Sequence, residues 1–213
     1  MLLQVSFDDF NLEKVKKIVI EIHQYIDILE VGTPLLLFEG INAIKFFKRK
    51  FSNKIILADT KIVDAGEIEA NIAFKAGADI VTVLGNSNIK TIYEAKKTAE
   101  KHNKMIMLDL IEIQKIEDIM DKIELLRNHI IMIHTGYDSG ILDFKNWIGK
   151  INNNVDLIKK LSNIKIAIGG GINEDNIGNF LNMSPDIIII GRSIIYTKNP
   201  LVTTKRFSEI IKK

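Results

Sequence analysis

The sequence alternates, at a regular spacing, between short apolar runs and longer segments with the periodicity of amphipathic helices. The short runs are rich in isoleucine and valine, and nearly continuous apolar runs are typical of parallel strands buried on both faces. Eight strands are predicted in this way, over residues 2–7, 26–29, 55–57, 79–84, 104–108, 130–133, 164–168 and 186–190. Helical segments follow them in turn, over residues 12–24, 39–51, 67–75, 89–102, 116–127, 155–161, 173–181 and 203–211.

This alternation predicts an α/β fold with a parallel sheet, because each helix then forms a crossover between neighbouring strands. Eight strand–helix units predict closure into a (β/α)8 TIM barrel, for which 213 residues lie near the lower end of the size range. No linker or change of composition divides the chain, so we expect residues 1–213 to form a single domain. An open doubly wound sheet is the alternative, but it would normally show a glycine-rich turn after the first strand, which is absent here. Residues 137–154 are expected to form a long irregular connection.

Composition excludes several classes of function. The 29 basic and 27 acidic residues are interleaved along the chain, which argues against a nucleic-acid partner. The absence of cysteine excludes disulfides and thiolate metal sites. No apolar stretch is long enough to span a bilayer. Asp8 and Asp9 interrupt the N-terminal apolar run, which argues against a signal peptide. We therefore expect a cytoplasmic protein without a membrane partner.

Charged side chains stand where the predicted strands end, and in (β/α)8 barrels this rim carries the active site. The set consists of Asp8, Glu30, Asp59, Lys61, Asp109 and His134. At an extended strand end, Asp59 and Lys61 are two apart and project to the same face. A single acid such as Asp59 or Asp64 could simply cap or flank the next helix. Four acids, a lysine and a histidine at one rim are better explained as a catalytic site.

The residue types suggest a division of labour within this set. Carboxylates suit a hard cation such as Mg²⁺, which binds few protein ligands and keeps waters or substrate oxygens, and Glu30 and Asp59 on neighbouring strands are the best pair. Lys61 stays charged among acids and can stabilise an oxyanion. His134 is the natural proton-transfer group near neutral pH.

The last two predicted strands end in glycines instead of acids. Gly169-Gly170-Gly171 follows one strand, and Gly191-Arg192-Ser193 follows the other. Glycine lets backbone N–H groups approach an anion closely, and the loops after strands seven and eight form the usual phosphate site of these barrels. We expect Gly170, Gly171, Gly191 and Arg192 to bind the phosphate of a small substrate.

Several motifs resemble one family over nearly the whole chain. Residues 59–64 match the D-x-K-x-x-D signature of the orotidine monophosphate decarboxylase suprafamily. Within it, the chain resembles the 3-hexulose-6-phosphate synthase family. The more specific motifs are VGTPLL at 31–36, DAGEIEANIAFKAGADIVTVLG at 64–85, AEKHNK at 99–104, LDLI at 108–111 and HTGYD at 134–138.

The resemblance implies a lyase that condenses D-ribulose 5-phosphate with formaldehyde to D-arabino-hex-3-ulose 6-phosphate, through an enediolate and with Mg²⁺ as cofactor. It implies metal ligation by Glu30 and Asp59, enediolate stabilisation by Lys61 and proton transfer by His134. Asp8 and Asp109 would contact the substrate or support the site. The resemblance further implies a homodimer with shared active sites, in which Asp64 reaches the site of the partner.

Other functions stay open at this point. The related keto-gulonate phosphate decarboxylases typically carry an arginine in the loop after the strand-six histidine, where this chain has Thr135-Gly136-Tyr137-Asp138, and this favours the synthase. Gly191-Arg192-Ser193, in contrast, looks more like the decarboxylase. A ribulose-phosphate epimerase would use histidines at several strand ends, and only one is present. A non-catalytic phosphosugar-binding barrel would have lost at least one of the site residues, and all are present.

Overall fold

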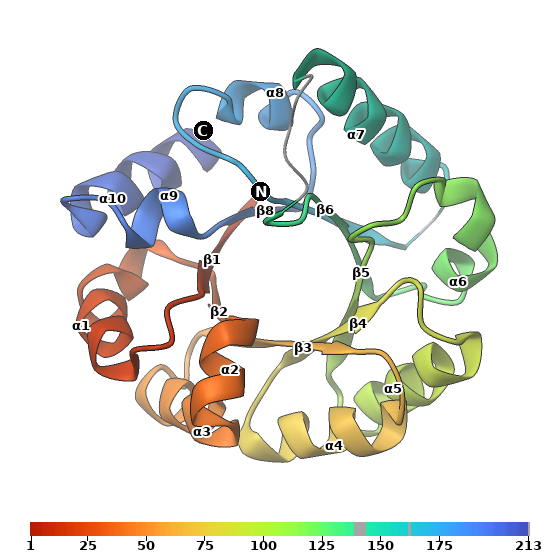
Figure 1. The fold of residues 1–213 in the computed structure, drawn as a ribbon, viewed down its shortest axis with the longest axis horizontal. Coiled ribbons are helices and arrows are strands. Elements are labelled where there is room, and N and C mark those ends of the chain that lie inside the picture. Colours follow the sequence, from red (N-terminus) through yellow and green to blue (C-terminus); the bar gives the residue numbers. More distant parts are fainter. Residues whose placement is uncertain (139–143, 162, 213) are drawn as a thin grey trace.

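The computed structural model, which describes residues 1–138, 144–161 and 163–212, is a closed barrel of parallel strands in sequence order (Figure 1). The strands are β1 (Leu2–Phe7), β2 (Ile28–Val31), β3 (Ile55–Ile62), β4 (Ile80–Leu84), β5 (Met105–Asp109), β6 (Ile130–His134), β7 (Lys165–Gly169) and β8 (Ile187–Ile190). β8 pairs with β1 from Leu2–Ile187 to Val5–Ile190 and closes the ring. The predicted (β/α)8 barrel is confirmed, and the open sheet is excluded.

Helices surround the barrel as an outer ring (Figure 1). They are α1 (Leu12–Ile22), α2 (Thr33–Glu39), α3 (Ile41–Lys50), α4 (Gly66–Ala76), α5 (Ile89–Lys101), α6 (Met120–Glu124), α7 (Phe144–Lys159), α8 (Ile177–Leu181), α9 (Arg192–Ile195) and α10 (Pro200–Ile211). Two 3-10 turns, η1 (His23–Tyr25) and η2 (Ile116–Ile119), extend α1 and precede α6. None of the helices in the described ranges is long and apolar enough to cross a membrane.

The structure differs from the prediction at three connections. Gly32-Thr33-Pro34 was expected only to break the chain after the second strand, but helix α2 begins there. Proline is compatible with the first turn of a helix. Gly40, at φ 61°, then separates α2 from α3. The expected irregular connection over 137–154 is wrong from residue 144 onward, because α7 covers that stretch; residues 139–143 lie outside the described residues.

The apolar core has two layers, because successive strand residues point to opposite sides of the sheet. The inner layer fills the barrel with Ile28, Leu57, Ile80, Met107, Ile130, Met132, Ala167, Ile187 and Ile189. The outer layer lies between the strands and the helices, and includes the fully buried rings of Phe7, Phe47, Phe180 and Phe207. Packing on both faces explains why the strands read as continuous apolar runs.

A repeated side-chain contact ties the strands together at the amino-terminal end of the barrel. The residue before each even-numbered strand accepts a hydrogen bond from a backbone N–H of the preceding strand. The four pairs are Asp27 Oδ2 with Leu3 N (2.9 Å), Asp79 Oδ2 with Ile56 N (2.9 Å), His129 Nδ1 with Ile106 N (3.1 Å) and Asp186 Oδ2 with Ile166 N (2.8 Å). Polar residues at this end therefore stabilise the barrel, and the opposite end is available for chemistry.

Candidate active site

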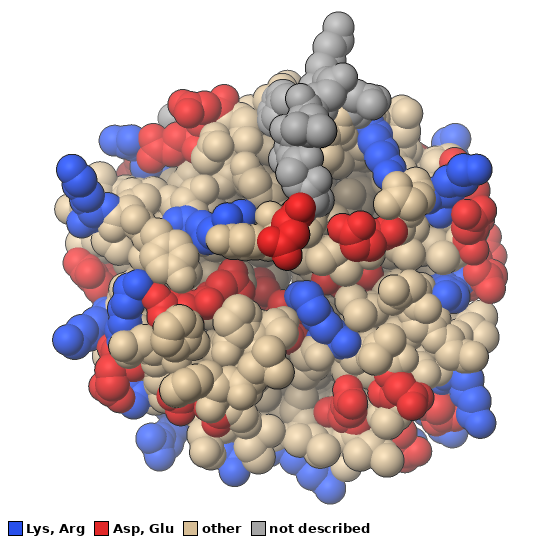
Figure 2. Space-filling view, in the orientation of Figure 1, with Lys and Arg blue, Asp and Glu red and all other residues tan. Residues whose placement is uncertain are grey.

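A pocket of about 740 Å³ opens at the carboxyl ends of the strands. Acidic side chains gather in the hollow at the centre of this face (Figure 2). Nine of the residues proposed from the sequence line the pocket: Asp8, Glu30, Asp59, Lys61, His134, Gly170, Gly171, Gly191 and Arg192. The other two lie elsewhere: Asp109 is fully buried and does not line the pocket, and Asp64 is exposed.

An alternating series of charged groups forms one side of the pocket. The Lys61 ammonium contacts Asp59 Oδ2 and lies 3.7 Å from Asp109 Oδ2. Asp109 also receives the His134 ring, whose Nδ1 lies 3.0 Å from both carboxylate oxygens. A carboxylate accepts only, so His134 donates from Nδ1–H and keeps Nε2 as the basic nitrogen. Asp109 thus supports Lys61 and His134, and its position favours that role over substrate contact.

Asp59 and Lys61 reach one pocket, but not along a regular strand end. β3 runs on to Ile62, and its register with β4 shifts between Ala58 and Ile62. Lys61 has φ 47°, in the left-handed region that a lysine rarely adopts. The bulge, together with the long lysine side chain, brings the ammonium directly onto the Asp59 carboxylate.

On the other side of the pocket, the negative charges of Asp59 and Asp8 disfavour ionisation of Glu30. Burial, followed by the nearby charges of Asp59 and Asp8, raises the pKa of Glu30 to about 8. Burial also raises the pKa of Asp8, against the opposing effect of a hydrogen bond from Ser6 Oγ (2.9 Å). Negative charge is therefore in excess here, and Glu30 is neutral at pH 7 unless a cation compensates it.

Asp59 is held as a carboxylate in the same surroundings. Burial by itself would raise its pKa, but the charge and hydrogen bond of Lys61, with the hydroxyls of Thr33 and Thr82, lower it below its usual value. Both hydroxyls donate over 2.8 Å, Thr33 to Oδ2 and Thr82 to Oδ1. Burial likewise opposes the charge on Lys61, but Asp59 and Asp109 outweigh it and raise the lysine pKa. The pair is ionised at neutral pH.

The donor set fits a hard divalent cation. Glu30 and Asp59 offer oxygen ligands, and the raised pKa of Glu30 marks a place where positive charge is lacking. Within the described part of the chain, no three His, Asp or Glu side chains converge into a closed metal site. Two carboxylates are a number of protein ligands that Mg²⁺ commonly takes, since it completes its shell with water and substrate oxygens.

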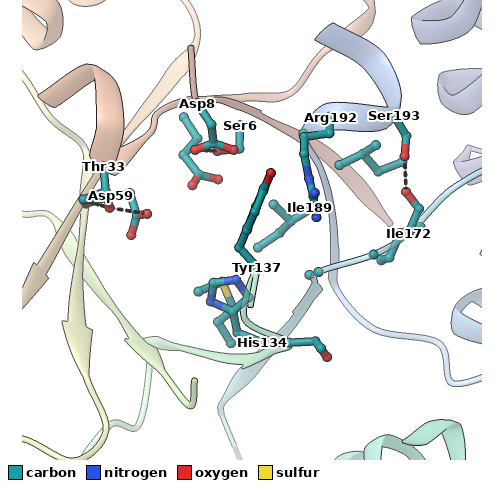
Figure 3. Close-up of a pocket in the computed structure, with 18 of the residues that line it drawn as sticks. Ser6, Asp8, Thr33, Asp59, His134, Tyr137, Ile172, Ile189, Arg192 and Ser193 are labelled. Carbon is teal, nitrogen blue, oxygen red and sulfur yellow. Dashed lines mark hydrogen bonds between the residues drawn. The ribbon is translucent and has the colours of Figure 1, made fainter. Parts of the chain in front are cut away.

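The glycine loops of β7 and β8 form the opposite wall of the pocket. Gly170 has φ 98°, and a Cβ there would lie 2.3 Å from the carbonyl oxygen of Thr135. Arg192 projects from the start of α9, and its guanidinium carbon lies 4.1 Å from the centre of the Tyr137 ring (Figure 3). No carboxylate of the described residues pairs with this guanidinium. An arginine in such a setting, beside glycine N–H groups, is suited to an anion such as phosphate.

Asp64 follows β3 on the outer surface and does not reach the pocket of its own chain. The N-cap residue of α4 is Ala65, with φ 50°, and no side chain accepts a capping hydrogen bond at this end of the helix. The alternative that Asp64 caps its own helix is therefore wrong.

Sequence reasoning overlooked the hydroxyl groups that hold the acids. Ser6, Thr33 and Thr82 each bond to an aspartate of the site. For Thr82 a signal was available, since it is the one polar residue within the apolar run IVTVL.

The fold and the pocket define a (β/α)8-barrel enzyme whose site combines acids, a lysine and a histidine with a wall of glycines and an arginine. Residues 1–207 match the family model described as "Orotidine 5'-phosphate decarboxylase / HUMPS family", and the chain belongs to this family. The chain is 36% identical over 211 residues to a 3-hexulose-6-phosphate synthase of Bacillus subtilis (strain 168), covering 99% of both chains.

Solved structures agree with this assignment. A crystal structure of 3-hexulose-6-phosphate synthase superimposes with a TM-score of 0.88 at 31% identity, over 99% of this chain and 100% of the other. A crystal structure of KGPDC from Streptococcus mutans superimposes with a TM-score of 0.88 at 27% identity, over 99% of this chain and 97% of the other. The resemblance inferred from the motifs is confirmed, and the chain is a lyase of this family.

Proposed function

We propose that the chain condenses D-ribulose 5-phosphate with formaldehyde to form D-arabino-hex-3-ulose 6-phosphate. The observation that carries this proposal is the arrangement of Asp59, Lys61, Asp109 and His134 opposite the anion-binding wall. Such a pocket can bind a phosphorylated ketose at one end and place its carbonyl end among proton-transfer and oxyanion-stabilising groups. The names of the similar synthases support this reading.

Proton transfer falls to His134. With Nδ1–H bonded to Asp109, Nε2 is free to take the C1 proton of the ketose. The C1–H electron pair moves toward C2, which gives an enediolate with negative charge on oxygen. Its C1 carbon then attacks the formaldehyde carbon to form the new C–C bond, and the resulting alkoxide takes up one proton. Atoms and charge balance without a redox partner.

Lys61 supplies fixed positive charge for the developing enediolate. Its ammonium is oriented by Asp59 and Asp109 before substrate arrives, so little reorganisation is needed during reaction. Glu30 and Asp59 are the residues that would hold Mg²⁺. When bound, the ion adds further positive charge for substrate oxygens.

Phosphate binding is assigned to Gly170, Gly171, Gly191 and Arg192. Gly191 also leaves room for Asp8, since a Cβ at that position would lie 3.1 Å from Asp8 Oδ2. Asp8 lines the pocket between the two ends and is placed to contact substrate hydroxyls.

Asp64 fits a homodimer with shared sites. It does not line its own pocket, and apolar side chains are exposed on α2, on α4 and in the loop before α4: Leu37, Phe38, Val63, Ile68 and Ile72. Exposed apolar groups of this kind are characteristic of protein–protein contacts. A partner covering them would bring Asp64 toward a second site.

The direct test is to incubate purified protein with D-ribulose 5-phosphate, Mg²⁺ and formaldehyde and to follow formaldehyde loss. Lys61→Ala should abolish turnover, and EDTA should abolish it until Mg²⁺ is restored. Full turnover in metal-free buffer would exclude the metal role of Glu30 and Asp59. No formaldehyde loss with the folded wild-type protein would refute the synthase.

Decarboxylation of 3-keto-L-gulonate 6-phosphate is the second candidate, and Arg192 together with the similarity to KGPDC favours it. The enediolate would then arise by loss of CO₂, with the same stabilising groups. We expect it to be the slower reaction, because Thr135-Gly136-Tyr137-Asp138 lacks the arginine that the decarboxylases typically carry in this loop. Faster release of CO₂ than loss of formaldehyde, measured on one preparation, would reverse the assignment.

A further inference from the structure

Thr82 lies within β4, between two residues that pair with the irregular part of β3. Figure 1 shows β4 beside β3 in the barrel. The residues on either side of it pair with Ala58 and Ile62, so residues 59–61 face Thr82 alone. Thr82 is only 1% exposed, and it does not line the pocket. A buried hydroxyl in this position needs partners, and its partners show what it does.

The Thr82 hydroxyl joins the two charged residues of β3. The backbone N–H of Lys61 donates to Thr82 Oγ1 over 2.8 Å, and Thr82 Oγ1 lies 2.8 Å from Asp59 Oδ1. A hydroxyl has one proton, so having accepted from Lys61 it donates to Asp59. The Thr82 carbonyl also accepts from Thr60 Oγ1 over 2.9 Å. All three residues of the irregular segment are thus held by one residue of β4.

The bulge explains why a side chain is needed here. Extra residues in a bulged strand lose their regular ladder partners. The Lys61 backbone, at φ 47°, is in a conformation that persists only when its surroundings hold it. The Thr82 hydroxyl takes the place of the missing ladder acceptor. Valine has the same shape but would leave both the Lys61 N–H and Asp59 Oδ1 without this partner.

We propose that Thr82 is a positioning residue, which holds the Asp59 carboxylate and the Lys61 backbone in their catalytic arrangement without touching substrate. The proposal rests on the proposed function for its kinetic test and deepens it. Phosphate is bound on the other wall, so a loss of Thr82 acts on the reacting end of the substrate alone.

The kinetic test is Thr82→Val. We expect kcat to fall about 10- to 100-fold, as for other residues that orient ligating or catalytic groups. KM for D-ribulose 5-phosphate should stay within about twofold, since an effect confined to the transition state leaves KM unchanged. Thr82→Ser, which keeps the hydroxyl, should recover most of kcat, whereas Thr82→Ala should not. The Ser and Ala pair answers the same question if the Val variant fails to fold.

Thr204→Val is the matched control. Thr204 is fully buried on α10, and its hydroxyl bonds to the Pro200 carbonyl over 2.6 Å, away from the pocket. The control loses a buried hydroxyl by the same substitution, and we expect its kcat to equal that of the wild type. An equal loss of kcat in both variants would reduce the role of Thr82 to general stability and overturn the proposal.

Amide hydrogen exchange of the substrate-free protein gives a readout that does not depend on activity. The Lys61 amide should be protected in the wild type and in Thr82→Ser, and should exchange at least about 10-fold faster in Thr82→Val, where its acceptor is absent. Unchanged Lys61 exchange together with unchanged kcat would overturn the proposal. An inactive wild type that still shows this exchange pattern would refute the proposed function but support the positioning role.

Discussion

Replacing Glu30 with glutamine should stabilise the metal-free protein while it abolishes catalysis. Glu30 is buried beside Asp59 and Asp8, and these surroundings raise its pKa to about 8. Glutamine keeps the shape and removes the ionisable group. Its carbonyl can still accept from Gln4 Nε2, as Glu30 Oε2 does over 2.5 Å, and its amide can donate to Gln4 Oε1, a buried atom without a partner among the described residues.

The sign of the effect follows from the direction of the shift. A group whose folded pKa lies above its unfolded value favours the folded state at low pH, and this contribution is lost as pH rises toward the folded pKa. For Glu30 the window runs from its ordinary value of 4.5 to about 8. At pH 7 the unfolded chain is favoured by about 3 kcal/mol, because this carboxyl ionises in the unfolded chain and stays mostly protonated in the folded protein. Glu30→Gln removes that penalty.

The assay is urea unfolding of both proteins in EDTA at pH 5 and pH 8, with Glu21→Gln, a surface substitution on α1, as control. The free energy of unfolding of Glu30→Gln should exceed that of the wild type at pH 8, and the difference should shrink at pH 5. Added Mg²⁺ should stabilise the wild type and leave Glu30→Gln unchanged. Equal stability of the two proteins at pH 8, or a difference independent of pH, would refute the electrostatic reasoning.

Three further predictions follow from other parts of the molecule. Arg192→Ala should raise KM for D-ribulose 5-phosphate by about 10-fold or more with little change in kcat, because phosphate binding is uniform along the reaction; initial rates measure this, and an unchanged KM would remove Arg192 from the phosphate site. Mixing inactive Asp64→Ala subunits with inactive Lys61→Ala subunits should partly restore activity, measured as loss of formaldehyde. In a mixed dimer, one shared site carries both substitutions and the other carries neither. An inactive mixture with proven subunit exchange would exclude shared sites. Burial lowers the pKa of His129, and its Nδ1 must stay unprotonated to accept the hydrogen bond from Ile106 N. Neutral His129 therefore stabilises the folded state above its ordinary pKa of 6.5, and this stabilisation is lost as pH falls below that value. His129→Asn should flatten the thermal stability profile between pH 7 and pH 5, and an unaltered profile would contradict the assigned acceptor role.

The amino-acid pattern was sufficient to predict the fold class and the end of the barrel at which the candidate pocket lies. Alternating strand and helix patterns are local, and the right-handed crossover rule leaves few ways to arrange eight such units. The carboxyl ends of all strands in a parallel barrel meet on one face, so strand-end residues such as Glu30 and His134 had to lie near one another. Glycines 170, 171 and 191 could be proposed as phosphate contacts from the sequence, because a residue without a side chain lets its backbone N–H approach an anion closely.

How these residues divide their work depends on contacts that form only in the folded barrel. The bulge at Lys61 depends on the register between β3 and β4, and no local pattern encodes that register. The sequence left open whether Asp109 contacts the substrate or supports the site, and the barrel buries it against Lys61 and His134, which favours the supporting role. The raised pKa of Glu30 likewise depends on burial in the closed barrel and on acids that are far away in sequence.

The failure to predict helix α2 also arose because contacts between distant segments are not visible in a local pattern. Gly32-Thr33-Pro34 reads as a breaker locally, yet Thr33 starts α2 and its hydroxyl bonds to Asp59, 26 residues further along the chain. Thr82 reads as one polar residue in a buried strand, and its partners become visible only once β3 lies beside it. Periodicity reports which face of an element is buried, whereas hydrogen bonds between elements depend on distances that the closed barrel alone defines.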